Sequence, residues 1–214
     1  MDTLQLVVVA AGLRQPSTTR MLADRLAAAA ERELLASEGS EVQVRVIELR
    51  ELATDIAHNL VTGFPNAVLA EALKAVESAD GVIAVSPIFS ASYSGLFKSF
   101  FDLIDPQALS GTPVLIAATG GSVRHSLALE HALRPLFAYL HATVVPTAVY
   151  AATEDWGASS GTETGDLAAR IDRAAAELAT LVTGGPGTRT RSAAAETDAE
   201  DFDDVIPFEQ LLGR

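Results

Sequence analysis

The stretch Gly12–Thr19 (GLRQPSTT) combines a glycine, an arginine and three consecutive hydroxyl side chains. Ser17 is a good N-cap for a predicted helix, so free N–H groups and the positive end of that helix would lie beside these hydroxyls. Such an arrangement binds a phosphate without a lysine. The alternative is that Ser17 merely caps the helix and Arg14 is solvated. The Gly-Lys-Ser/Thr ending of a nucleotide P-loop and the GxGxxG dinucleotide fingerprint are both absent.

A second stretch, Ser86–Lys98 (SPIFSASYSGLFK), is both apolar and rich in hydroxyl groups. It follows Gly81–Val85, a β-branched run typical of a buried parallel strand, and leads into a predicted helix at Gly95–Leu103. An amphipathic loop at the carboxyl end of a strand suits a flat ring system. The alternative is that Phe89 and Tyr93 are ordinary core or interface aromatics.

The third stretch is Ala118–Ser122 (ATGGS), directly after another predicted strand. Its adjacent glycines leave backbone N–H groups uncovered, so they could approach an anionic or carbonyl-bearing ring edge. A TGG turn is a weak signal alone. The three stretches together are a stronger one, because parallel strands bring such loops to the same edge of a sheet.

Strands and helices alternate along the chain. We predict strands at Leu4–Ala11, Val42–Leu49, Gly81–Val85, Pro113–Ala118 and Thr143–Tyr150. We predict helices at Met21–Leu35, Ala67–Ser78, Gly95–Leu103, Arg124–Leu140 and Leu167–Val182. Arg50–Asn66 is expected to be irregular, and Pro135 to kink its helix or cap a shorter piece. The pattern indicates an α/β, flavodoxin-like three-layer sandwich with a five-stranded parallel sheet in the order 2-1-3-4-5.

Composition changes near the carboxyl terminus. We predict one domain over residues 1–183, followed at 184–214 by a flexible acidic linker and an apolar docking peptide. Ser192–Asp204 is small and acidic, whereas Phe202–Leu212 regains apolar side chains. We expect this last peptide to dock on its own subunit or on a neighbouring one.

Bulk properties exclude several classes of protein. The chain has 214 residues, 49% of them hydrophobic, which is enough for one domain with a core. A net charge of −13 without a basic cluster argues against nucleic-acid binding. No cysteine is present, so disulfides, thiol catalysis and zinc–thiolate sites are excluded. With no signal peptide and no membrane span, we expect a soluble, cytoplasmic protein.

Few other residues suggest acid–base or metal chemistry. His125, just after the third stretch, could act as a catalytic acid, although a helix-start histidine contacting backbone or a partner chain is the favoured reading. Lys98 and Asp102 are spaced for a helical ion pair at a surface or interface. The remaining histidines show no ligand spacing, so no metal site is predicted. The helix at Gly95–Leu103 is apolar on more than one face, and we expect part of it to contact another subunit.

The segments GLRQPSTT, PIFSASYSGLFKSFFDL and ATGGS resemble the flavin-binding segments of NADPH-dependent FMN reductases over about Leu4–Tyr150. The family's middle segment commonly reads Pro, Glu, Tyr, Asn, then Ser, Pro-Gly and Leu-Lys-Asn. This chain keeps Pro87, Ser92, Gly95 and Lys98, and departs at Ile88, Phe89, Ser90, Ser94 and Phe97. Backbone contacts rather than side-chain hydrogen bonds are expected at the altered positions. The SYSG motif and the DDVIPFEQLL tail resemble a subfamily paired with luciferase-like monooxygenases.

The resemblance implies a role for each stretch in binding FMN. The phosphate would be held, beside the turn at Gly12, by Arg14, Ser17, Thr18 and Thr19. The isoalloxazine and ribityl groups would lie against Pro87, Ile88, Phe89 and Ser90, with Ser92 and Tyr93 in the same segment. The pyrimidine edge would face Thr119, Gly120 and Gly121. No catalytic acid is nominated, because the flavin itself carries hydride chemistry.

The leading hypothesis is therefore an FMN reductase that takes hydride from NADPH or NADH and supplies reduced flavin to a partner monooxygenase. A homodimer or homotetramer is expected. One alternative is an FMN-containing quinone or azo reductase on the same fold. Another is a non-enzymatic, flavodoxin-type electron carrier.

Overall fold

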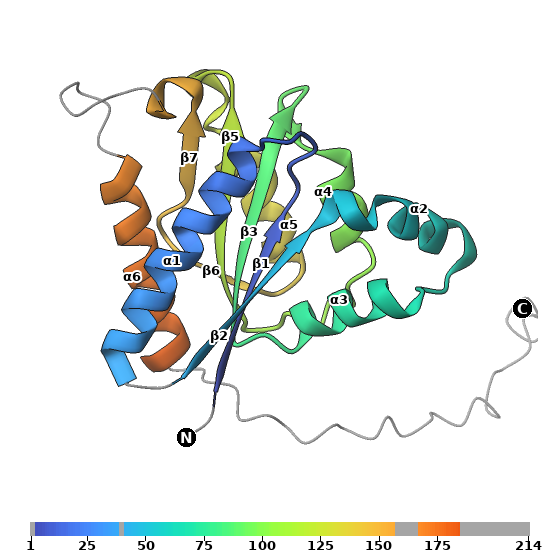
Figure 1. Ribbon diagram of the computed structural model, residues 1–214, viewed down its shortest axis with the longest axis horizontal. Coiled ribbons are helices and arrows are strands. Elements are labelled where there is room, and N and C mark those ends of the chain that lie inside the picture. Colours follow the sequence, from blue (N-terminus) through green and yellow to red (C-terminus); the bar gives the residue numbers. More distant parts are fainter. Residues whose placement is uncertain (1–2, 39–40, 157–166, 185–214) are drawn as a thin grey trace, which may run out of the picture.

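A parallel sheet forms the middle layer of the fold, with helices on both faces (Figure 1). The computed structural model describes residues 3–38, 41–156 and 167–184. The strands are β1 (Leu4–Ala10), β2 (Val42–Glu48), β3 (Gly81–Phe89), β4 (Ser92–Tyr93), β5 (Pro113–Gly120), β6 (Thr143–Val144) and β7 (Val149–Ala152). The α-helices are α1 (Thr18–Glu38), α2 (Ala53–Thr62), α3 (Ala67–Glu77), α4 (Gly95–Phe101), α5 (Arg134–Tyr139) and α6 (Leu167–Gly184). Shorter helical pieces are the 3-10 turns η1 (Leu49–Leu52), η2 (Val123–His125) and η4 (Thr153–Trp156), and the π-helix η3 (Leu129–Leu133).

The sheet runs in the order β2-β1-β3-β5-β6, with β7 also pairing with β5 and β4 pairing antiparallel with β3. The predicted doubly wound, three-layer, flavodoxin-like fold is thereby confirmed. The predicted count of five strands was wrong, since the sheet has seven, so the order is not exactly the predicted 2-1-3-4-5. The two additional strands are β4, which is a hairpin return of β3, and a second piece of the predicted fifth strand.

The predicted fifth strand, Thr143–Tyr150, is broken in its middle. Pro146 lies in the break, where it has no N–H to give to a ladder. Arg134 supplies donors instead, because its guanidinium bonds the carbonyl oxygens of Val145 and Pro146 at 3.1 Å each. Both pieces, β6 and β7, remain parallel to β5.

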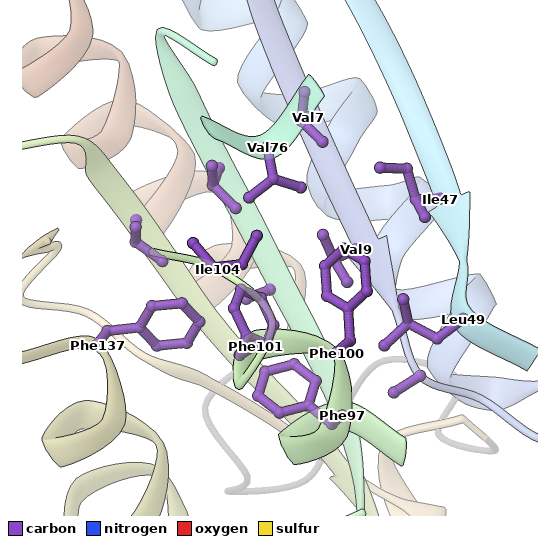
Figure 2. Close-up of a cluster of buried hydrophobic side chains, with 14 of the residues drawn as sticks. Val7, Val9, Ile47, Leu49, Val76, Phe97, Phe100, Phe101, Ile104 and Phe137 are labelled. Carbon is purple, nitrogen blue, oxygen red and sulfur yellow. The ribbon is translucent and has the colours of Figure 1, made fainter. Parts of the chain in front are cut away.

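β1 is nearly all buried because helices cover both of its faces. Val7 and Val9 pack into the core on the side of α3, α4 and α5 (Figure 2). Leu6 and Val8 pack on the opposite side, against α1 and α6. This alternation follows from the two-residue period of a strand and explains the unbroken apolar run.

Two helical predictions needed correction. Arg50–Asn66 was expected to be irregular, but it contains most of η1 and all of α2. Gly63, at φ 80°, ends α2, and its N–H donates a hydrogen bond to the carbonyl oxygen of Asn59. Arg124–Leu140 was expected to be one helix, but it is divided among η2, η3 and α5. Pro135 lies in the first turn of α5, which confirms the shorter, proline-started piece.

The aromatic side chains of α4 build the core of their own subunit. Phe97, Phe100 and Phe101 are fully buried, and Figure 2 shows them gathered with Phe137 of α5. The ring centroids of Phe97 and Phe101 lie 4.7 Å apart, and those of Phe101 and Phe137 lie 4.9 Å apart nearly edge to face. These phenyl groups therefore need no second subunit to be buried.

The predicted linker and docking peptide lie outside the described residues, apart from Gly184 at the end of α6. Among the described helices, none has the length and apolar character required to cross a bilayer.

Candidate functional site

The loop after β1 folds back over Gly12, which is buried. A Cβ atom at this position would collide with the hydroxyl oxygen of Ser17, so a larger residue here would have to displace the Ser17 side chain. Ser17 caps α1 as predicted: its Oγ accepts from the N–H of Arg20 at 3.2 Å, and its carbonyl accepts from Met21 N–H at 3.0 Å. A hydroxyl that accepts a hydrogen bond still has its own proton to donate. Capping and anion binding are therefore compatible at Ser17.

The amino end of α1 is open to an anion. Its first turn contains no acidic residue, and Thr18 is exposed. The next basic residue, Arg20, already forms ion pairs with Asp24 at 2.7 Å and with Glu48 at 2.5 Å. The hydrogen bond to Asp24 raises the pKa of Arg20. Arg14 is exposed and has no ion pair with any described carboxylate. Arg14 is thus the arginine of this loop that remains available for a ligand.

A buried hydrogen bond joins the first stretch to the third. Thr19 Oγ1 lies 2.8 Å from Thr119 Oγ1, across 100 residues of sequence. Only 2% of Thr19 and 4% of Thr119 is exposed. The bond places the start of α1 directly beside the end of β5.

The glycine turn after β5 is held by a tyrosine. A Cβ atom at Gly120 would collide with the phenol oxygen of Tyr150, which therefore fills the space beside the turn. The Tyr150 hydroxyl donates to the carbonyl oxygen of Ser122 at 2.9 Å. Burial, followed by the nearby charge of Asp155, raises the pKa of Tyr150, so the phenol stays a donor at neutral pH.

The second stretch is a β-hairpin rather than a long loop. The predicted strand end at Val85 was wrong, because β3 continues to Phe89 and returns as β4. The two-residue turn is Ser90-Ala91, with φ 48° and 68°. Positive φ at both central positions matches the right-handed twist of a hairpin, although neither residue is glycine.

Hydrogen bonds of two serines, Ser86 and Ser94, stabilise the base of this hairpin. Ser86, completely buried, donates to the carbonyl oxygen of Pro87 at 2.9 Å and accepts from the N–H of Ser94 at 3.0 Å. Ser94 in turn caps α4 by accepting from Phe97 N–H at 3.1 Å. Pro87 lies opposite Thr119 in the β3–β5 ladder. The second and third stretches are therefore neighbours in the sheet.

The three stretches meet at one edge of the sheet, as the topology predicted. The amino end of α1, the β3–β4 hairpin and the loop after β5 all lie at the top of Figure 1. Besides the Thr19–Thr119 bond, Ala11 N–H donates to Val85 O at 2.9 Å. The side chain of Ile88 lies 3.8 Å from the Cβ position of Gly120. This edge therefore brings together Gly12, Arg14, Ser17, Thr18, Thr19, Pro87, Ile88, Phe89, Ser90, Thr119, Gly120 and Gly121.

Ser92 and Tyr93, on the return strand of the hairpin, have different surroundings. They line a cavity of ≈700 Å³ bordered by α4, η3 and α5. Lys98, Asp102, His131 and Tyr139 also line it. Of the predicted cofactor residues in the hairpin, Phe89 is 48% exposed and is the aromatic side chain most open to a ligand.

The remaining candidate residues are His125, Lys98 and Asp102. His125 is exposed on η2, and its backbone N–H donates to Ser122 O at 3.3 Å. Lys98 and Asp102 form the predicted ion pair at 2.5 Å, which raises the pKa of Lys98. Within residues 3–38, 41–156 and 167–184, no group of His, Asp and Glu side chains could hold a metal ion.

Sequence reasoning missed two residues that shape the site. The sequence contained one indication for Ser86, because this hydroxyl residue directly follows five apolar residues of a predicted strand. Tyr150 carried none, because its contact with Gly120 crosses thirty positions of sequence and depends on the pairing of β5 with β7.

A doubly wound sheet whose carboxyl-end loops offer hydroxyls, an open helix terminus and a glycine turn defines the flavodoxin-like class of mononucleotide-binding proteins. The model of the family described as NADPH-dependent FMN reductase matches residues 4–157. The chain belongs to this family. As the sequence predicted, its activity is that of an oxidoreductase that reduces FMN with NAD(P)H.

Relatives and solved structures agree. An FMN reductase (NADPH) of Pseudomonas aeruginosa is 41% identical over 181 residues, 85% of this chain and 93% of that protein. The NADH-dependent FMN reductase SfnF of Pseudomonas putida is 42% identical over 153 residues, 72% of this chain and 80% of that protein. An oxidoreductase structure from Corynebacterium diphtheriae has a TM-score of 0.78 and 46% identity, covering 85% of this chain and 97% of its own.

The residues at the sheet edge fit FMN. Gly121, which follows Gly120, has no atom within 4 Å of its Cβ position, so the backbone there is open to a ligand. The amino end of α1 lacks acidic residues and has hydroxyls beside it, which suits a phosphate.

Proposed function

We propose that the chain holds FMN across the three stretches and catalyses hydride transfer from NAD(P)H to it. The observation that carries this proposal is the Thr19–Thr119 hydrogen bond, because it makes the helix terminus and the glycine turn two walls of one site. A phosphate at α1 and a ring beside β5 would then belong to one ligand.

The phosphate is assigned to the amino end of α1. Ser17, Thr18 and Thr19 supply hydroxyls there, and Arg14 supplies a positive charge that no described carboxylate neutralises. The helix dipole adds to this attraction.

The ring is assigned to the hairpin and the glycine turn. Pro87, Ile88, Phe89 and Ser90 line one side, and the backbone of Thr119–Gly121 faces the pyrimidine edge. When bound, FMN supplies the hydride-accepting ring, which then carries two electrons. The role of the protein is to orient that ring and to place N–H dipoles where negative charge develops.

His125 is not required as an acid in this scheme. Its exposure and its place beside the glycine turn make it a residue of the site's rim. We assign proton exchange at the reduced flavin to solvent.

The biological context is part of the same proposal. The relatives named above use NADH or NADPH, so either nucleotide is a candidate donor. The SYSG motif and the DDVIPFEQLL tail support a flavin-dependent monooxygenase as recipient of the reduced flavin. We further propose a cytoplasmic homodimer or homotetramer, a folded domain over residues 1–183 and a docking role for the carboxyl-terminal peptide. The exposed Tyr139 beside the cavity at α4 and α5 supports self-association.

The test is a titration of the purified chain with FMN followed by NADPH and NADH oxidation assays. We expect saturable FMN binding and nicotinamide oxidation with free FMN as acceptor. Oxidation only with a quinone would favour the quinone reductase, and no oxidation with either acceptor would favour the electron carrier.

A matched pair of variants locates the phosphate. Arg14→Gln should raise the Kd for FMN by roughly ten-fold, since a charged hydrogen bond is lost. Arg173→Gln, which changes an exposed arginine on α6, should leave that Kd unchanged. Equal effects of the two variants would contradict the assignment.

A further inference from the structure

Thr19 and Thr119 are a polar pair in a place where an apolar pair would fit. Both side chains are at least 96% buried and come from different layers of the fold, Thr19 from α1 and Thr119 from β5. Valine has nearly the same shape, and burying a hydroxyl costs free energy unless it is hydrogen-bonded. Two valines would therefore join these layers as well as two threonines do. The hydroxyls call for a reason beyond packing.

The pair holds more protons than its own hydrogen bond uses. Each hydroxyl has one proton and can accept two bonds, and at 2.8 Å either oxygen can be the donor. One proton lies between the two oxygens, so the accepting threonine keeps its own proton free. That proton can be donated to a ligand.

The surroundings of each threonine decide which direction of the Thr19–Thr119 hydrogen bond a bound ligand would favour. Thr19 lies in the first turn of α1, where an anion would sit, and Thr119 lies next to Gly120 at the end of β5, beside the ring edge. If Thr119 donates to Thr19, the Thr19 proton points to the phosphate side. If Thr19 donates to Thr119, the free proton belongs to the ring side.

We propose that Thr119 is a positioning residue for the FMN phosphate, acting through Thr19. A bound phosphate fixes the pair in the direction in which Thr119 donates to Thr19 and Thr19 donates to the phosphate. Thr119, although it lies at the ring edge, thereby contributes to the preference for FMN over riboflavin. This inference rests on the proposed function, since it assumes that the phosphate lies at α1.

The experiment compares the Kd of FMN and of riboflavin, which lacks the phosphate, by flavin fluorescence on the full-length chain. In Thr119→Val, we expect FMN binding to weaken about ten-fold while riboflavin binding stays within about two-fold. Thr119→Ser keeps the hydroxyl and should restore the preference. Thr143→Val, which removes an exposed hydroxyl at the opposite end of the sheet, serves as the matched control and should change neither value.

A second variant separates binding from folding. Thr19→Val/Thr119→Val removes both hydroxyls and leaves no buried group unpaired, so its melting temperature should stay close to that of the unaltered chain. Its preference for FMN should still be lost.

Equal weakening of FMN and riboflavin in Thr119→Val, or no change in either, would overturn the inference. If the unaltered chain binds FMN no better than riboflavin, the phosphate assignment at α1 fails, and the role of Thr119 fails with it. That failure would be visible in the unaltered chain and is distinct from a failure confined to the variants.

Discussion

The phenol of Tyr150 occupies the space that a side chain at Gly120 would need, and it also bonds the carbonyl of Ser122. The glycine turn is therefore held by a steric fit and a hydrogen bond from one side chain. Gly120→Ala should lower the melting temperature and weaken FMN binding, because the added methyl group forces the phenol away. Loss of the hydrogen bond alone is worth about 1 kcal/mol, and overpacking adds about 1–3 kcal/mol.

Tyr150→Phe provides the control for this collision. Alone it should lower the free energy of unfolding by about 1 kcal/mol, since Ser122 O loses its donor. In the Gly120→Ala background, it should instead raise the melting temperature, because it removes the oxygen nearest to the new methyl group. Additive losses in the double variant would show that the two residues do not compete for the same space.

Ala91→Gly should stabilise the protein. Ala91 has φ 68° in the hairpin turn, and a non-glycine residue in this left-handed region costs about 1–2 kcal/mol. The entropy of glycine in the unfolded chain offsets part of that gain, which leaves about 0.5–1 kcal/mol. Thermal melting measures the effect. Ala70→Gly inside α3 is the matched control and should cost about 1 kcal/mol.

Glu130 and Arg134 should give a small pH-dependent contribution to stability. The hydrogen bond from Arg134 lowers the pKa of Glu130, so this contribution is present above the unfolded-state pKa and is lost as the pH falls through the folded-state value. Because 47% of the Glu130 side chain is exposed, Glu130→Gln should cost only a few tenths of a kcal/mol at pH 7. In urea unfolding, the difference between this variant and the unaltered chain should shrink as the pH falls below the ordinary range of a glutamate.

Arg134→Met should cost more than Glu130→Gln, about 1–2 kcal/mol, because the carbonyls of Val145 and Pro146 also lose their donor. Equal costs for the two variants would mean that the break between β6 and β7 does not depend on Arg134.

Glu77→Gln should stabilise the protein at neutral pH. Burial, together with the charge of Asp105, raises the pKa of Glu77, which also lies at the negative end of α3. A raised pKa favours the folded state at low pH, and this advantage is lost as the pH rises through the folded-state value. Glutamine carries no charge, so a gain of about 0.5–1 kcal/mol is expected at pH 7 and none below pH 4. Urea unfolding at both pH values tests the sign.

Removal of all residues after Thr188 should lower the melting temperature or change the oligomer size. The prediction comes from the apolar residues that return at Phe202–Leu212 after an acidic stretch. Thermal melting and size-exclusion chromatography measure the two effects. Unchanged values in both would exclude a docking role for the peptide.

Much of the fold could be predicted because its signals are local. The Val-rich run of β1, the cap at Ser17 and the proline-started α5 each depend on residues within one element. Parallel topology then places the three stretches at one edge, since the carboxyl ends of β1, β3 and β5 all lie there. The resemblance to FMN reductases rests on the same local segments.

Other features were not predictable from local signals. The Ser90-Ala91 turn has no glycine or asparagine to announce its positive φ angles. The carbonyl oxygens at the break beside Pro146 accept hydrogen bonds from Arg134, which lies in the preceding helix. Gly63 ends α2, but a glycine is equally compatible with an irregular segment, so the sequence did not indicate the helix before it.

The sequence alone therefore determined the elements, their alternation and the chemistry available at the ends of β1, β3 and β5, because periodicity and capping act over a few residues. Only the tertiary structure decided that Thr19 bonds Thr119 and that Tyr150 fills the space beside Gly120. Those contacts join residues far apart in the chain, and their energies depend on distances that exist only once the sheet has assembled.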